Sequence, residues 1–369
     1  MSKVLKSWLP VIIICFAPLL VHTYPPEIIE KIDKRLYFAT FILIVLCLLF
    51  YKFFQNSEQI SENKIYKFVN IFPDWMLLLT IFLFLLITQN YFLNYETLTW
   101  DVPSYLVATY DVENGNLPYT TQWETKGPLL VYIYSFISLI AGKSYVFFRI
   151  INDIVLFLIV FVLFKISIIL SKKNKAISYF SALLFSSIFG MRWYVSEFSE
   201  VYCILFLSIS YWIHLTNEKN NYKKLIFTGA LISLSSLINQ VSILFLIPIF
   251  FDIFINKTKK YKQISIVLFS SAIPQILFFL LYFLSGHLNI YLINYFILPF
   301  TYVENTGVDK NLIYEFTVWL RELFWYQKYL YFSIILILFF NFVELFNNSF
   351  LNNIKKYSLI YLSTILSFS

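Results

Sequence analysis

The residues of this chain that are best suited to chemistry lie in one polar stretch between long apolar runs. The stretch begins at Trp100-Asp101, continues through Asn114-Gly115-Asn116-Leu117-Pro118-Tyr119 and ends at Lys126-Gly127-Pro128-Leu129. Between Asn94 and Lys126 the chain carries several carboxylates and one lysine, namely Glu96, Asp101, Asp111, Glu113, Glu124 and Lys126. Acid, base and aromatic groups gathered beside a membrane indicate a site that binds a polar or charged ligand.

Transfer of a sugar from a lipid-linked donor is one reaction that these groups would serve. It needs a base near the acceptor, a cation near the leaving phosphate and a groove for a lipid tail. Asp101 is the candidate base, and Lys126 is the candidate partner of the phosphate. The alternatives are that Asp101 is a solvated or helix-capping carboxylate and that Lys126 is a lysine whose ammonium group reaches the membrane interface.

Weaker candidates surround this pair. Arg149 and Asp153 are spaced i, i+4, so they predict either an ion pair or, for Arg149, a contact with the phosphate. Glu197 and Glu200 would hold the acceptor or a divalent metal, although no histidine accompanies them. Asp111 and Glu124 would solvate the loop or orient the acceptor. No cofactor is certain, and a divalent metal stays open.

The composition predicts an all-α, polytopic integral membrane protein. Of the 369 residues, 59% are hydrophobic and only 13% are charged, which excludes a soluble fold. The net charge of +7 does not indicate a nucleic-acid partner, because the lysines lie in short clusters between apolar runs, where they orient helices. The cysteines fall inside apolar segments and suggest no disulfide framework.

Apolar segments give the predicted topology. Candidate spans are 8–22, 36–54, 75–92, 150–170, 177–192, 201–216, 225–238, 241–256, 263–284 and 329–347. With the N-terminus inside, most lysine clusters are cytoplasmic, and residues 93–149 form a long first extracytoplasmic loop that contains interfacial helices. Residues 128–142 then form a helix along the outer membrane surface that ends at Gly142, and a re-entrant hairpin is the alternative.

The order of the motifs resembles that of the GT-C membrane glycosyltransferases, in the branch of the protein O-mannosyltransferases and the lipid A aminoarabinose transferases (glycosyltransferase family 39-like). Members show, after an early span, an Asp, a Tyr, a Gly-x-x-Pro-Tyr stretch, a Lys-Pro-Pro-Leu element, a later Arg, and a Gly-rich helix that ends in a polar-Gln pair. The matching positions are Asp101, Tyr105, Gly115 to Tyr119, Lys126 to Leu129, Arg149, and Gly229 through Asn239-Gln240. Gly127 replaces the first proline, and Asn239 stands where many relatives have Lys.

The resemblance implies a catalytic role for Asp101 and donor-phosphate binding by Lys126, with Arg149 as a second cation. Contact with the acceptor, or support for the residues that make it, is expected from Tyr105, Asp111, Tyr119, Glu124, Glu197 and Glu200. The implied fold is a GT-C-type helical bundle. Its expected parts are 1–74, with two extra N-terminal transmembrane helices and a cytoplasmic loop, 75–300, the catalytic core, and 301–369, an outer loop and C-terminal helices that are expected to be truncated.

The predicted function is therefore transfer of a sugar from a polyprenyl-phosphate donor, with inversion, to a protein, lipid or glycan acceptor. The expected location is the bacterial inner membrane, with the active site on the extracytoplasmic face, in contact with membrane lipid and without nucleic acid. Two alternatives stay open: a flippase or carrier of lipid-linked sugars, and a membrane subunit without catalysis.

Overall fold

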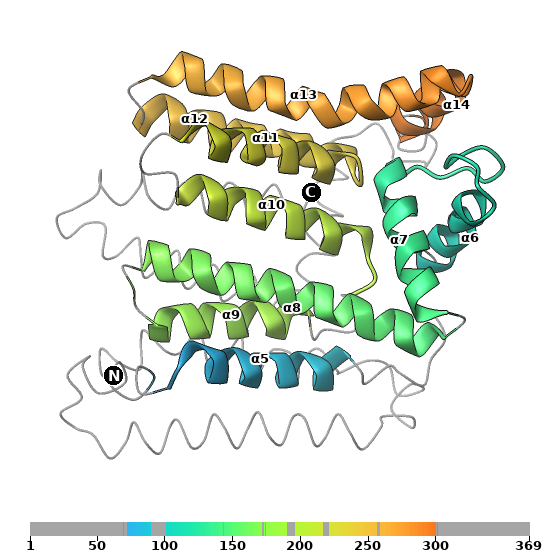
Figure 1. The fold of residues 1–369 in the computed structure, drawn as a ribbon. Helices are drawn as coiled ribbons and strands as arrows, with labels where there is room; N and C mark the ends of the chain where they lie inside the picture. The colour runs from blue at the N-terminus through green and yellow to red at the C-terminus, as the bar shows by residue number, and fades with distance from the viewer. Residues whose placement is uncertain are drawn as a thin grey trace, which may run out of the picture. The chain divides into compact units, whose positions relative to one another are not determined.

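The computed structural model describes residues 69, 72–89, 101–142, 144–171, 173, 175–189, 196–216, 221–256, 259–299 and 301. Within these residues all regular secondary structure is helical, which confirms the all-α prediction for this part of the chain (Figure 1). The elements are α5 (Asp74–Gln89), α6 (Asp101–Glu113), α7 (Pro128–Ala141), α8 (Tyr145–Leu170), α9 (Lys175–Phe189), α10 (Ser199–Leu215), α11 (Tyr222–Ser236), η2 (Gln240–Phe245), α12 (Leu246–Asn256), α13 (Lys260–Leu284), α14 (Leu288–Leu292) and η3 (Ile293–Ile297).

The apolar segments of the sequence correspond to most of these helices. Helices α8, with 26 residues, and α13, with 25 residues, are long and apolar enough to cross a membrane. The expected segments 75–92, 177–192, 201–216, 225–238 and 241–256 fall on α5, α9, α10, α11, and η2 with α12. The expected spans 8–22, 36–54 and 329–347 lie outside the described residues.

The chain divides into two compact units, and the division falls within α8 after Val162. In the first unit, α5 packs against α9, and Thr80 Oγ1 lies 3.1 Å from the Tyr179 hydroxyl. Asp74, at the start of α5, forms ion pairs with Lys165 at 3.5 Å and Lys175 at 2.8 Å. These polar contacts tie the start of α5 to the neighbouring ends of α8 and α9.

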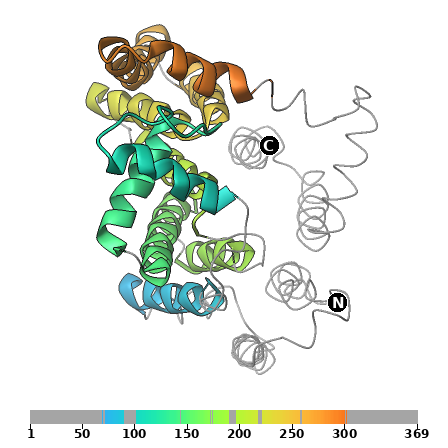
Figure 2. The same ribbon diagram turned by 90° about the vertical axis from the view of Figure 1, so that its right-hand side faces the viewer.

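In the second unit, α11 lies between α10 and α13 (Figure 2). Its buried side chains form a core with α12 and α13, made of Leu225, Ile232, Leu246, Ile249, Ile253 and Val267. Gly229 permits the close approach of α11 and α13, because a Cβ atom there would lie 2.3 Å from the Val267 carbonyl oxygen. This unit carries the candidate site.

Helix α6 lies in the long first loop, where interfacial helices are expected but where the sequence predicts no helix bounds for this segment. Asp101 in its first turn, Pro103 near its start and Gly115 at φ 79° just after its end are typical helix boundary signals. Its buried residues recur at helical spacing, and Val102 and Tyr105 pack in the core that α6 shares with α7. The abundance of carboxylates in this segment masked its amphipathic pattern.

Helix α7 begins at Pro128, a favoured residue at the first helical position, and ends before Gly142, whose φ is 61°. The expected helix over 128–142 is therefore present, and its orientation along the membrane surface stays a prediction. Phe136, Leu139 and Ile140 expose one apolar face of α7, while Leu130 and Tyr134 on another face are fully buried. Tyr134 makes an edge-to-face contact with Tyr105 of α6, with ring centroids 5.6 Å apart.

Candidate functional site

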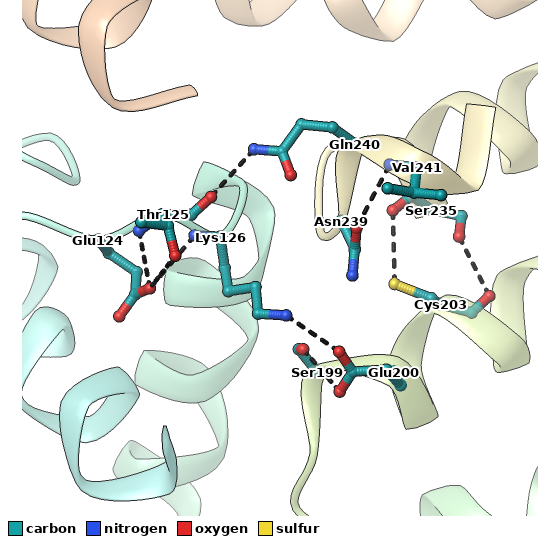
Figure 3. A network of polar contacts seen from close by, with 10 residues as sticks. All are labelled: Glu124, Thr125, Lys126, Ser199, Glu200, Cys203, Ser235, Asn239, Gln240 and Val241. Atoms are coloured by element: carbon teal, nitrogen blue, oxygen red, sulfur yellow. Dashed lines mark hydrogen bonds and ion pairs between the residues drawn. The ribbon is translucent and has the colours of Figure 1, made fainter. Parts of the chain in front are cut away.

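Lys126 extends its side chain toward α10 and forms an ion pair with Glu200 (Figure 3). Lys126 Nζ lies 3.0 Å from Glu200 Oε1, and Ser199 Oγ donates a hydrogen bond of 2.9 Å to Glu200 Oε2. The side chains of Lys126 and Glu200 are 24% and 49% exposed. The Lys126 side chain is thus partly exposed, and its ammonium group is paired with the Glu200 carboxylate.

The electrostatic surroundings keep Lys126 charged. Burial alone would lower the pKa of its ammonium group, but the charge of Glu200 and the hydrogen bond to it outweigh that effect and raise the pKa above its ordinary value. The charge of Asp101 acts in the same direction as a smaller contribution.

The backbone around Lys126 is held by side chains of the same loop. Glu124 Oε1 accepts hydrogen bonds from the Thr125 N–H at 2.8 Å and from the Lys126 N–H at 3.2 Å. The Tyr119 hydroxyl donates a 2.6 Å hydrogen bond to the Lys126 carbonyl oxygen. Glu124 and Tyr119, both candidates for contact with the acceptor or for support of the site, position Lys126 in this structure.

A second set of contacts docks the lysine segment on the end of α11. The Gly127 N–H donates to the Ile238 carbonyl oxygen at 2.8 Å, and the Leu129 N–H donates to the Leu237 carbonyl oxygen at 3.1 Å. A Cβ atom at Gly127 would lie 2.0 Å from the Leu237 carbonyl oxygen. These contacts explain why glycine stands here in place of the proline of similar motifs, since proline has no N–H to donate.

Replacing Gly127 by Ala is expected to destabilise this unit by about 1–3 kcal/mol, because the added methyl group overlaps backbone that cannot move aside easily. Thermal unfolding of the purified protein in detergent measures the loss. Gly286→Asn is the matched control, since no atom lies within 4 Å of a Cβ there and asparagine tolerates the positive φ of 77°. Equal unfolding temperatures for Gly127→Ala and the wild type would contradict the docking role.

Asp101, the candidate base, is the first residue of α6, and its side chain is exposed. Ser104 Oγ connects it to the lysine loop, because this hydroxyl lies 2.8 Å from the Asp101 carbonyl oxygen and 3.2 Å from Glu124 Oε2. Tyr105, one helical turn after Asp101 in α6, is buried. Burial raises the pKa of the Tyr105 hydroxyl, and the charges of Glu200 and Asp101 add to the increase.

Asp111 lies at the other end of α6 and anchors the loop. It is fully buried and accepts hydrogen bonds from the Thr121 N–H at 3.1 Å and the Gln122 N–H at 3.3 Å. The Tyr119 backbone next to these residues adopts a positive φ of 74°. Asp111 therefore stabilises the bend that leads to Lys126, and contact between Asp111 and an acceptor stays a prediction.

Arg149 of α8 and Glu197, which lies just before α10, form a buried ion pair. Arg149 Nε lies 2.6 Å from Glu197 Oε1, and their side chains are only 3% and 0% exposed. The Tyr145 hydroxyl lies 3.1 Å from both partners. Asp153, expected as an i, i+4 partner of Arg149, accepts a 2.6 Å hydrogen bond from Ser196 Oγ. Arg149 and Asp153 thus each hold the turn that precedes Glu200.

Two further residues belong to the site, although the sequence analysis named them only as a loose motif match. Gln240 Nε2 donates hydrogen bonds of 3.0 Å to the carbonyl oxygens of Thr125 and Tyr295. Asn239 Oδ1 accepts a 3.3 Å hydrogen bond from the Val241 N–H. Their position just after a predicted apolar segment was the available signal, but nothing local connected them to Lys126.

The described residues contain no group of three or more His, Cys, Asp or Glu side chains arranged to hold a metal ion. Glu197 and Glu200, the expected candidates, are engaged with Arg149 and Lys126 respectively.

Comparison with protein families gives a match between residues 125–284 and the model of the family described as dolichyl-phosphate-mannose-protein mannosyltransferase. Comparison with curated proteins and with solved structures gives no match. The matched segment includes Lys126, Arg149, Glu197, Glu200 and Asn239, and Asp101 precedes it.

Proposed function

We propose that this chain is a polytopic membrane glycosyltransferase of the GT-C type and that it uses a polyprenyl-phosphate sugar as donor. The match between residues 125–284 and the model of the dolichyl-phosphate-mannose-protein mannosyltransferase family supports this proposal. The acceptor is a protein, lipid or glycan on the extracytoplasmic face of what we take to be a bacterial inner membrane. The observation that carries the proposal is the arrangement of Lys126, whose backbone is fixed on several sides while its side chain remains partly exposed.

A fixed cation suits a leaving phosphate. The negative charge on the phosphate increases as its bond to the sugar breaks, and a positioned ammonium group stabilises that charge without reorganising. Glu124, Tyr119 and the α11 carbonyl groups hold the segment in advance of the reaction. The free-energy cost of positioning the ammonium group is therefore incurred when the protein folds and not during the reaction.

The proposed reaction is a single displacement at the anomeric carbon of the donor. Asp101 accepts the proton of the acceptor hydroxyl or amine as that group attacks, and a new bond forms to the anomeric carbon. The bond from this carbon to the phosphate oxygen breaks, and its electron pair leaves with the phosphate, which Lys126 stabilises. Attack opposite the leaving group inverts the configuration of the sugar.

Glu200 has a specific place in this scheme. Because its carboxylate neutralises Lys126 in the present structure, a donor phosphate must take over that contact. Arg149 and Glu197 support the turn before α10, and Glu200 lies in the first turn of that helix. The proposed contact of Arg149 with the phosphate would require its guanidinium group to leave the buried pair, so we favour support of Glu200 as its role.

Replacing Glu200 by Gln is expected to tighten binding of undecaprenyl phosphate about 1.4- to five-fold, which corresponds to the roughly 0.2–1 kcal/mol of an exposed ion pair. Loss of the competing carboxylate leaves Lys126 free to contact the phosphate. Titration of the lipid into the purified protein, followed by native mass spectrometry, measures the change. Glu113→Gln is the control, since this exposed glutamate lies at the far end of α6 from Asp101. Weaker binding by Glu200→Gln would contradict the competition.

The function is tested by mass spectrometry of cell-envelope glycans, lipids and glycoproteins from cells with and without the gene. The proposal expects one sugar to be absent from one class of acceptor when the gene is deleted, and to return with the wild-type chain. Complementation with Lys126→Ala separates transfer from a structural contribution of the protein. Restoration of the sugar by that variant, or an unchanged envelope after deletion, would overturn the proposal.

A further inference from the structure

We propose that Asn239 donates a hydrogen bond to the same phosphate that Lys126 binds, so that the phosphate is held by one charged and one neutral donor. The inference rests on the proposed function and adds a ligand-binding residue to it. Asn239 lies between the end of α11 and η2, on a segment distant in sequence from the lysine loop.

The register between the two segments places Asn239 opposite Lys126. On one side, the Gly127 N–H donates to the Ile238 carbonyl oxygen at 2.8 Å. On the other side, Gln240 Nε2 donates to the Thr125 carbonyl oxygen at 3.0 Å. The neighbours of Lys126 are therefore paired with the neighbours of Asn239 in opposite order. Only Lys126 and Asn239 remain to face one another between these two contacts.

The orientation of the Asn239 amide follows from its other hydrogen bond. Its Oδ1 accepts from the Val241 N–H, and a backbone N–H requires an oxygen rather than an NH₂ group at that position. The amide nitrogen is consequently the free end of the side chain. Figure 3 shows it pointing toward the ion pair of Lys126 and Glu200.

Gln240 makes this arrangement rigid. Its Nε2 also donates to the Tyr295 carbonyl oxygen at 3.0 Å, and the Tyr295 hydroxyl donates to the Ser236 carbonyl oxygen at 2.8 Å. Gln275 Nε2 adds a 2.8 Å hydrogen bond to Ser236 Oγ. Contacts from η3 and α13 therefore fix the segment from which Asn239 projects.

The chemistry of a phosphate fits two unlike donors. Its several oxygens accept hydrogen bonds in different directions, and an ammonium group acts on them as a point charge without a preferred direction. A fixed amide supplies direction and adds no further positive charge beside Lys126. The ligand class is a phosphate that carries a polyprenyl chain, which both the sugar donor and the released product contain.

Asn239→Asp gives the sharpest test, because it keeps the size of the side chain and the oxygen that accepts from the Val241 N–H. Asp and Asn are equally good in that capping position, so a purely structural role predicts no loss of thermal stability. Because a carboxylate beside Lys126 would also compete with the phosphate as Glu200 does, Asn239→Ser is the variant that isolates the contribution of the amide. A ligand role predicts that the carboxylate repels the phosphate and weakens binding of undecaprenyl phosphate about ten- to a hundred-fold. Asn239→Ser retains a capping oxygen without the amide and is expected to weaken binding about ten-fold.

The assay titrates undecaprenyl phosphate into the purified protein in detergent, with undecaprenol as the matched probe that lacks a phosphate. Both Asn239 variants should lose affinity for the phosphate and bind the alcohol as the wild type does. Wild-type phosphate affinity in Asn239→Asp, together with weaker binding by Lys126→Ala, would overturn only the role of Asn239. Wild-type affinity in Lys126→Ala as well would overturn the proposed phosphate site itself.

Discussion

Replacing Asp101 by Asn is expected to lower the rate of sugar transfer by about 10²–10⁴-fold, the usual contribution of a positioned general base. Asparagine keeps the shape of the side chain and its place at the start of α6, but it cannot accept the proton of the acceptor. Binding of undecaprenyl phosphate should stay near the wild-type value. Initial rates of transfer from a polyprenyl-phosphate sugar by the purified protein measure the effect.

Glu113→Gln is the matched control for Asp101→Asn. Both carboxylates are exposed and lie on α6, but Glu113 is at its opposite end, where Oε1 accepts a 2.9 Å hydrogen bond from Thr109 Oγ1. Its replacement should leave transfer within about two-fold of the wild type, as for an ordinary surface substitution. Full activity in Asp101→Asn would remove Asp101 from the chemistry, whereas equal losses in both variants would indicate a general effect of the helix.

Replacing Lys126 by Ala is expected to weaken binding of undecaprenyl phosphate about ten- to a hundred-fold, because a charge-assisted hydrogen bond to the phosphate contributes about 1.5–3 kcal/mol. Transfer should fall by at least as much, since the leaving phosphate also loses its stabilising cation. The fold should change little, because the contacts that hold this segment use its backbone. Lipid titration and initial transfer rates on the same preparation separate the two effects.

Lys223→Ala is the control for the loss of a positive charge. Lys223 is exposed at the start of α11, away from the α11 end on which Gly127 and Leu129 dock. Its removal should change neither the affinity nor the rate. Loss of phosphate binding in Lys223→Ala alone, with Lys126→Ala unaffected, would move the phosphate to the other end of the unit.

Much of the helical architecture could be predicted from the sequence, because long apolar segments such as those of α8 and α13 are distinct from the charged turns between them. The bounds of helix α6 could not be predicted, for a physical reason. Its buried face is narrow and mixes Val102 and Ala108 with the polar residues Thr109 and Asp111, so its periodicity is weak. Burial of Asp111 depends on backbone N–H donors that come from a later turn.

The residues of the candidate site could be predicted better than the contacts between them. Asp101, Lys126 and Glu200 were identified as polar residues near apolar segments, and the structure pairs two of them. The spacing of residues does not reveal that Glu200 is the partner of Lys126. The turn before α10 is joined to α8 by the ion pair of Arg149 and Glu197, and these two residues are far apart in sequence.

The role of Asn239-Gln240 shows the same limit in another form. Spacing along the chain places this pair more than a hundred residues from Thr125, and only the hydrogen bonds between the two segments reveal that they share a register. In the sequence, Gly127 stands where similar motifs have the first proline of the Lys-Pro-Pro-Leu element. The structure explains the glycine, because the Leu237 carbonyl oxygen lies where a Cβ atom would be.

A structure of the protein with undecaprenyl phosphate bound tests the central claim most directly. The phosphate should lie against Lys126 Nζ, with the Glu200 carboxylate displaced, the Asn239 amide within hydrogen-bond distance and Asp101 open to the same space. Density for the phosphate at a different cluster of cations, with the pair of Lys126 and Glu200 intact, would contradict the account.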